Sequence, residues 1–241
     1  MKTKLIFLVT IIGLLMAQCA SIKSVPKPAN EADYLSTLKT ELNKQWPANR
    51  NINLVFHGHS VPSGYAKTPE VHTFDSYPYQ LLALLKQQYP YAVINIIITA
   101  KGGENSIQGA KRFEQDVLIH KPDVLFIDYA LNELNTDPNK TNTAWNSMIK
   151  KATNHGIKVI LLTPSPDLRV NMADSNNPLK QHTDQIIRLA RENHVGVVNS
   201  FGVFNDLYVK GDSLKNYMAQ VNHPNKSGNA LIANQLFKWF K

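Results

Sequence analysis

The fold is decided by the stretch from Asn53 to Pro62, which reads NLVFHGHSVP. It begins as a short apolar run, and the run stops at a glycine. This pattern predicts a buried strand that ends in a tight turn. In open parallel α/β sheets, ligands bind at the carboxyl ends of the strands. The turn therefore places the hydroxyl of Ser60 where a parallel sheet would hold a ligand.

Four more apolar runs follow and alternate with segments that have helical spacing. We expect strands at residues 53–56, 92–99, 123–128, 158–163 and 195–199, and helices at residues 31–46, 78–89, 106–120, 144–155, 179–193 and 227–240. This alternation predicts right-handed βα units and a parallel sheet covered by helices on both faces. The sequence shows no internal repeat, so we expect a single α/β domain over residues 31–241.

The start of the chain has the pattern of a secretory signal. Lys2 and Lys4 precede an apolar segment, residues 5–16, which is too short for a confident membrane span. We therefore expect residues 1–19 to be a signal peptide and the protein to be exported. Residues 20–30 contain two prolines and are expected to form a flexible tether.

Cys19 is the only cysteine in the chain, so no internal disulfide can form. Its position resembles that of a bacterial lipoprotein signal, in which the cysteine becomes the lipidated first residue. We therefore expect a lipid anchor on Cys19, which would hold the protein at a membrane of the cell envelope. The alternative is an ordinary signal peptide cut near Cys19 or Ala20, which would release the protein.

The formal net charge is +8, but the lysines are scattered along the sequence. Binding to nucleic acid requires basic residues gathered on one face, so we expect no nucleic-acid partner. A scattered positive excess weakly favours anionic surfaces or glycans.

Four residues at strand ends or near the C-terminus carry the chemistry that the sequence suggests, namely Ser60, Gly103, Asn132 and His223. A serine needs a base to act as a nucleophile, and histidine is the usual one. A tetrahedral intermediate needs hydrogen-bond donors aimed at its oxyanion. The backbone N–H of a glycine and the amide of an asparagine can both supply them.

The order and setting of these residues resemble the SGNH, or GDSL-type, hydrolases over roughly residues 50–240. The matching blocks are Gly58–Ser60 for Gly-Asp-Ser, Gly102–Ser106 for the second block, Tyr129–Glu133 for Gly-x-Asn-Asp, and Asn222–Asn225 for the end of Asp-x-x-His-Pro-Asn. The resemblance implies a flavodoxin-like three-layer α/β/α sandwich with a five-stranded parallel sheet. It also implies hydrolysis of esters, often acyl groups on lipids or glycans, without a cofactor.

The sequence departs from the family pattern in ways that bear on the mechanism. His59 stands where the family has aspartate, Ala130 replaces a glycine and Glu133 replaces an aspartate. The largest departure is Gln220, which occupies the position of the family's triad acid. A Ser-His dyad helped by an amide or a backbone carbonyl is one interpretation. A carboxylate from elsewhere is the other, with four candidates: Glu104, Glu133, Asp206 and Asp212.

Three other interpretations stay open. The pair His57 and His59 suggests a metal-dependent hydrolase, because histidine is a common zinc ligand. The loss of the acid suggests a binding module without catalysis, and the same four residues could also transfer an acyl group to an acceptor other than water. Tyr77, Tyr129 and Trp145 either line an acyl or sugar pocket or belong to the core. Our principal expectation is an exported serine esterase that hydrolyses acyl esters, acetyl esters among them, of glycans or lipids.

Overall fold

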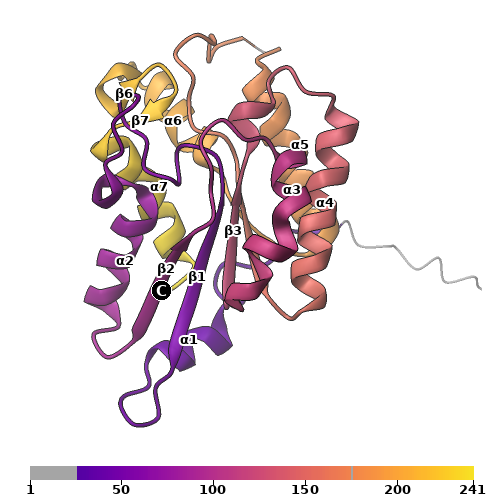
Figure 1. The fold of residues 1–241 in the computed structure, drawn as a ribbon. Coiled ribbons are helices and arrows are strands. Elements are labelled where there is room, and N and C mark those ends of the chain that lie inside the picture. Colours follow the sequence, from indigo (N-terminus) through magenta and orange to yellow (C-terminus); the bar gives the residue numbers. More distant parts are fainter. Residues whose placement is uncertain (1–25, 175) are drawn as a thin grey trace, which may run out of the picture.

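The computed structural model describes residues 26–174 and 176–241, which form a three-layer α/β/α sandwich (Figure 1). Its central sheet has five parallel strands in the order β2-β1-β3-β4-β5. The strands are β1 (Asn51–Gly58), β2 (Val93–Ile98), β3 (Val124–Asp128), β4 (Lys158–Leu162) and β5 (Gly196–Val198). Each expected strand is present, and the expected fold class is confirmed.

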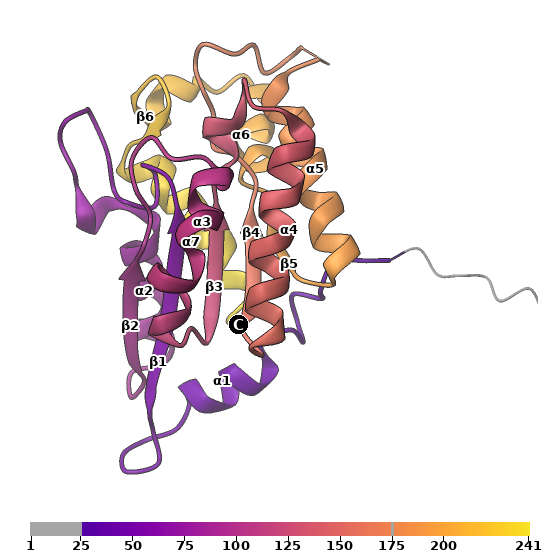
Figure 2. The same cartoon turned by 45° about the vertical axis from the view of Figure 1, so that its right-hand side comes forward.

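Helices cover both faces of the sheet, as the two views show (Figures 1 and 2). One side holds α1 (Ser36–Leu42), α2 (Tyr77–Gln88), α6 (Ser200–Val209) and α7 (Lys226–Lys238); the other holds α3 (Ser106–Asp116), α4 (Pro138–Asn154) and α5 (Pro178–Asn193). Short 3-10 turns lie at Thr73–Asp75, Leu118–His120, Ala130–Glu133 and Leu214–Tyr217, and a small hairpin joins β6 (Met218–Gln220) to β7 (His223–Pro224).

The central strands are apolar on both sides because each side faces a helical layer. In β1, Phe56 packs with the α2 and α7 side, whereas Val55 packs with the α3 and α4 side. Phe56 also stacks on Phe126 of β3, with ring centroids 4.4 Å apart. Burying one such side chain contributes about 1.5–3 kcal/mol, so these runs account for much of the stability of the sheet.

The structure corrects the helices expected from sequence at three places. The first is shorter than residues 31–46, and α4 begins at Pro138 instead of residue 144. A proline at the first turn and a side-chain cap from Asp137 explain that earlier start. Helix α6 was not expected at all.

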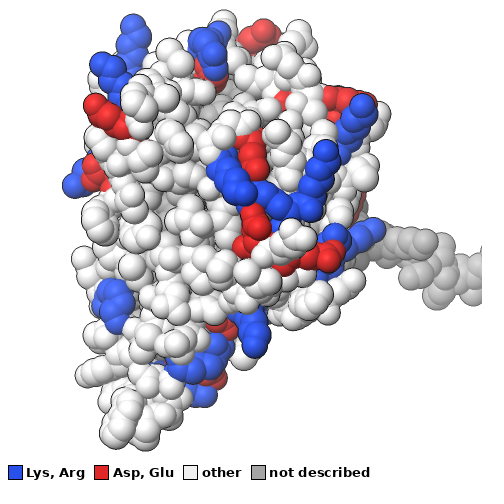
Figure 3. Space-filling model, in the orientation of Figure 1, with Lys and Arg blue, Asp and Glu red and all other residues white. Residues whose placement is uncertain are grey.

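On the face drawn in Figure 3, basic and acidic side chains are interspersed over α3 instead of being separated by sign. Arg112 pairs with Asp116 at 2.9 Å, and Lys101 pairs with the same carboxylate at 3.3 Å. The positive charge on this face is thus balanced locally by carboxylates.

The expected signal peptide at residues 1–19, with Cys19, lies outside the described residues. Of the expected tether, the described part contacts the domain: the backbone N–H of Ala29 donates to the carbonyl of Val195 at 3.1 Å. In the part of the chain that the structure covers, no helix has the length and apolar character needed to cross a bilayer.

Gly58, at the end of β1, is required for a reason that the turn pattern did not predict. A Cβ at this position would lie 2.2 Å from the backbone oxygen of Asp128 in the neighbouring strand. We expect Gly58→Ala to lower the free energy of unfolding by about 3 kcal/mol, because a backbone atom cannot move aside cheaply.

Urea denaturation of the matched variant Gly211→Ala provides the control. Gly211 has φ +86° and open space around it, so alanine there costs about 1 kcal/mol of backbone strain and no clash. Equal midpoints for the two variants would contradict the predicted close approach.

Candidate active site

The side chains of Ser60 and His223 meet at the carboxyl edge of the sheet. Ser60 follows β1, and His223 begins β7, just before α7. The imidazole Nε2 of His223 lies 2.8 Å from the hydroxyl oxygen of Ser60. Both residues are largely buried, with 7% and 5% of their surface exposed. A histidine at this distance can accept the proton of the serine hydroxyl.

Three hydrogen-bond donors lie in loops at the same edge. The sheet order places β1 between β2 and β3, so the loops that carry Ser60, Gly103 and Asn132 are neighbours. The Asn132 amide donates one hydrogen to the backbone oxygen of Glu104 at 2.8 Å, which joins two of these loops. Within the described residues, the backbone N–H groups of Ser60 and Gly103 have no acceptor. These N–H groups and the second amide hydrogen of Asn132 are available to a bound oxygen.

The backbone of Gly103 explains why a glycine stands there. Its φ is +80°, in the left-handed region that favours glycine, and a Cβ would meet no atom within 4 Å. The requirement is therefore conformational and differs from that of Gly58, where space is lacking.

The second imidazole nitrogen of His223 has two neighbours. Nδ1 lies 3.0 Å from the backbone oxygen of Ala66 and 2.7 Å from the amide nitrogen of Gln220. Ala66 belongs to the loop between β1 and α2. The sequence allowed for help from an amide or a backbone carbonyl, but a backbone carbonyl leaves no signature in a sequence, so the residue that supplies it could not have been predicted. Burial lowers the pKa of His223 below its usual value, which keeps the ring neutral and able to accept a proton.

The carboxylates considered as substitutes for the triad acid are engaged elsewhere or distant. Glu104 forms a two-pronged ion pair with Arg112, and Asp212 accepts from the Tyr217 hydroxyl at 3.0 Å. Glu133 is buried and accepts from the Trp145 indole at 3.0 Å and from a backbone N–H at the start of α3. Asp206 lies in α6. Among the described residues, none of these four carboxylates contacts His223.

The two histidines of the His-x-His pair have separate environments. His57 is fully buried, with Nδ1 2.9 Å from the Thr99 hydroxyl and Nε2 3.2 Å from the backbone oxygen of Gly109. Burial lowers the pKa of His57 to about 3, so it stays neutral. His59 instead accepts from the backbone N–H of Val61 through Nδ1.

Nε2 of His59 faces the Asp128 carboxylate at 3.3 Å, on the side of the sheet where Tyr77 donates to the same carboxylate. In residues 26–174 and 176–241, no three ligating side chains gather as a metal would need. The pair therefore has no shared site in the described structure.

A network of polar side chains supports the loop that carries Gly103. The Tyr129 hydroxyl lies 3.1 Å from Nε2 of His57 and donates to Glu104 at 3.3 Å. Arg112 donates to the same carboxylate and forms an ion pair with it. Tyr129 is fully buried, as are Tyr77 and Trp145. These three aromatic residues therefore belong to the core and its hydrogen bonds, and they do not line an open pocket.

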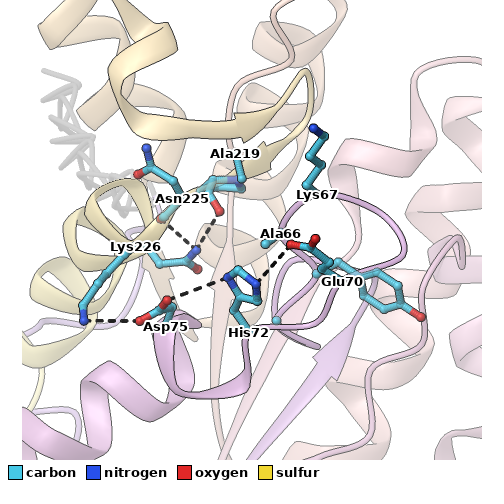
Figure 4. A pocket seen from close by; sticks show the side chains of 12 residues that line it. Ala66, Lys67, Glu70, His72, Asp75, Ala219, Asn225 and Lys226 are labelled. Atoms are coloured by element: carbon cyan, nitrogen blue, oxygen red, sulfur yellow. Dashed lines mark hydrogen bonds and ion pairs between the residues drawn. The ribbon is translucent and has the colours of Figure 1, made fainter.

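A cavity of about 250 Å³ lies against the Ala66 loop (Figure 4). Its lining includes polar side chains from that loop and from α7. Figure 4 shows His72 between the carboxylates of Glu70 and Asp75, with Lys226 reaching Asp75 at 3.3 Å. The side chains of Ser60 and His223 do not line this cavity.

The fold and the four loops define the class of protein. A family model for the GDSL-like lipase/acylhydrolase family matches residues 56–231. The match spans most of the chain and includes every loop described above. This protein therefore belongs to that family, and it is an ester hydrolase.

Solved structures of esterases share the fold. An acetylxylan esterase from Geobacillus stearothermophilus, Axe2, is 19% identical, with a TM-score of 0.68 over 78% of this chain and 94% of that one. A two-domain esterase active on acetylated mannans, co-crystallised with mannopentaose, is 21% identical, with a TM-score of 0.70 over 87% of this chain and 53% of that one. No curated protein sequence matches this chain.

Proposed function

We propose that this protein is an exported serine esterase that removes short acyl groups, acetyl above all, from glycans. The observation that carries the proposal is the 2.8 Å contact between the Ser60 hydroxyl and Nε2 of His223. This is the geometry that a serine needs to lose its proton to a base as it attacks a carbonyl carbon.

The reaction proceeds through an acyl-enzyme. His223 takes the proton of Ser60 as Oγ bonds to the ester carbon, and the carbonyl oxygen becomes an oxyanion. The N–H groups of Ser60 and Gly103 and the Asn132 amide hold that oxyanion. Collapse breaks the bond to the alcohol oxygen, which leaves with the proton from His223. Water then attacks the acyl group with His223 as base, which frees the acid and restores Ser60.

The glycan substrate is supported by analogy with neighbours in fold. Axe2 is described as an acetylxylan esterase, and the two-domain enzyme is described as active on acetylated mannans. Export is supported by the sequence pattern of residues 1–19, and attachment to the envelope by the position of Cys19. Together these features favour a polymeric glycan outside the cytoplasm over an intracellular metabolite.

The proposed substrate class is tested by acetate release from acetylated xylan and acetylated mannan by the protein lacking residues 1–19. Acetate released from either polymer, and lost after Ser60→Ala, is the expected result. Hydrolysis of p-nitrophenyl acetate without release from any acetylated glycan would reject the glycan while retaining the esterase.

Tyr65 supports the small size of the acyl group. Its ring centroid lies 6.0 Å from that of His223, and a Cβ added at Gly102 would lie 3.2 Å from the same ring. The ring thus spans from the histidine to the loop that carries Gly103, and from this placement we infer that it limits the space beside Ser60.

Shortening Tyr65 should therefore admit longer acyl chains. We expect Tyr65→Ala to raise the ratio of kcat/KM for p-nitrophenyl butyrate over p-nitrophenyl acetate by about tenfold. Tyr65→Phe keeps the ring and should leave this ratio unchanged. An unchanged ratio in Tyr65→Ala would place the acyl group on another side of Ser60.

A further inference from the structure

The two contacts at Nδ1 of His223 require opposite protonation of that nitrogen. The backbone oxygen of Ala66, at 3.0 Å, can only accept, so this contact needs a proton on Nδ1. The amide nitrogen of Gln220, at 2.7 Å, can only donate, so this contact needs a bare Nδ1. A neutral imidazole satisfies one of these contacts at a time.

The orientation of the Gln220 amide is fixed by its other partners. Its oxygen accepts from the backbone N–H of Thr68 at 3.0 Å. Its nitrogen lies 3.1 Å from the Thr68 hydroxyl and 3.3 Å from Oδ1 of Asn222, so two amide hydrogens are shared among these acceptors and the nearer Nδ1 of His223. Turning the amide over would bring its NH₂ group against the Thr68 N–H, which is also a donor. Gln220 is therefore tied to the loop that carries Ala66, with its nitrogen toward His223.

Each tautomer gives Ser60 a different partner. With the proton on Nδ1, the ring donates to Ala66, and bare Nε2 accepts from the Ser60 hydroxyl, as proton abstraction requires. With the proton on Nε2, the ring accepts from Gln220 and donates to the oxygen of Ser60. In this second state Nε2 cannot take the serine proton.

We propose that the backbone carbonyl of Ala66 orients His223 in place of a triad carboxylate, and that Gln220 competes with it by stabilising the inactive tautomer. Ala66 and Gln220 are positioning residues, since both act through His223. The proposal rests on the proposed function, because the productive tautomer is defined by the step at Ser60. The equilibrium between the Nδ1–H and Nε2–H forms of the His223 ring exists without substrate and can be measured in the free protein.

Gln220→Glu tests the competition with little change of shape. A carboxylate can accept both from the Thr68 N–H and from a protonated Nδ1, and it has no hydrogen to donate to the imidazole. Only the productive tautomer is then favoured. We expect kcat/KM for p-nitrophenyl acetate to rise about tenfold. This is the effect expected when one hydrogen bond at Nδ1 stops stabilising the inactive tautomer and stabilises the productive one.

The pH profile adds a readout that a purely structural role would not change. The titratable side chains facing the ring are His59, from the end of β1, and Tyr65, from the loop. A carboxylate at position 220 raises the pKa of His223, which must be neutral to act as base. The acid limb of kcat/KM should therefore move up by about one pH unit. Asn222→Asp adds the same charge beside Gln220 and should shift the limb less.

The tautomer itself is measured by ¹⁵N NMR of the His223 ring in the absence of substrate. We expect a mixture of the Nδ1–H and Nε2–H forms in the natural protein and the Nδ1–H form alone in Gln220→Glu. A single Nδ1–H form in both proteins, or an unmoved acid limb, would overturn the competition. Failure of the serine mechanism would appear separately, as activity retained in Ser60→Ala.

Discussion

Ser60→Ala is expected to lower kcat for ester hydrolysis by at least about 1,000-fold, because the variant has no oxygen to form the acyl-enzyme. His223→Ala should cost a similar factor, since the Ser60 hydroxyl would lose the base that lies 2.8 Å from it. The double variant should be no worse than either single one, because the two side chains act in one proton transfer. The measurement is the rate of p-nitrophenyl acetate hydrolysis by the three variants.

The folded state should be almost unaffected by the serine change. Ser60 is small, and its side-chain oxygen has one partner among the described residues, so the denaturation midpoint should match that of the natural protein. Additive losses in the double variant, or substantial turnover by Ser60→Ala, would contradict the serine mechanism. Inhibition of that residual turnover by a chelator would then favour metal chemistry.

Asn132→Ala is expected to lower kcat by about 100-fold or more, the usual cost of one oxyanion donor. The amide has a second effect, since its bond to the backbone oxygen of Glu104 ties the loop of Asn132 to the loop of Gly103. Loss of the Asn132 amide should change kcat more than KM, because the oxyanion donors are needed chiefly when negative charge develops on the carbonyl oxygen.

Asn132→Asp keeps the size of the side chain and removes both donor hydrogens. A carboxylate there would repel the oxyanion, so this variant should be at least as slow as Asn132→Ala. An Asn132→Ala variant with natural kcat and a raised KM would show that the residue binds substrate and does not stabilise the transition state.

The sheet could be predicted from sequence because its strands are short, apolar and separated by helical spacing. The run at Leu54 and the β-branched run at Val93 have this pattern, and both form strands in a sheet covered on two sides. Helix α6 was missed because its sequence, SFGVFNDLYV, is rich in β-branched and aromatic residues and contains a glycine. It is a helix because Asn199 caps its start and Phe204 packs into the core.

The candidate site was predictable where chemistry depends on side-chain type. Ser60, Gly103 and Asn132 each follow a strand, and the strand order makes their loops neighbours. The supporting contacts were not predictable, because they join residues far apart in the chain. The hydroxyl of Tyr129 lies beside His57, 72 positions earlier, and no local pattern indicates that pairing.

The contact between Nδ1 of His223 and the Ala66 carbonyl cannot be removed by a point mutation of residue 66. A single nucleotide change can turn an aspartate codon into an asparagine codon, and so remove the charge of an ordinary triad. No codon change can remove a peptide carbonyl, because every amino acid brings the same group. Saturation mutagenesis at position 66 would therefore show only which side chains fit there. It would not reveal the role of the backbone carbonyl that contacts His223, because every variant keeps it.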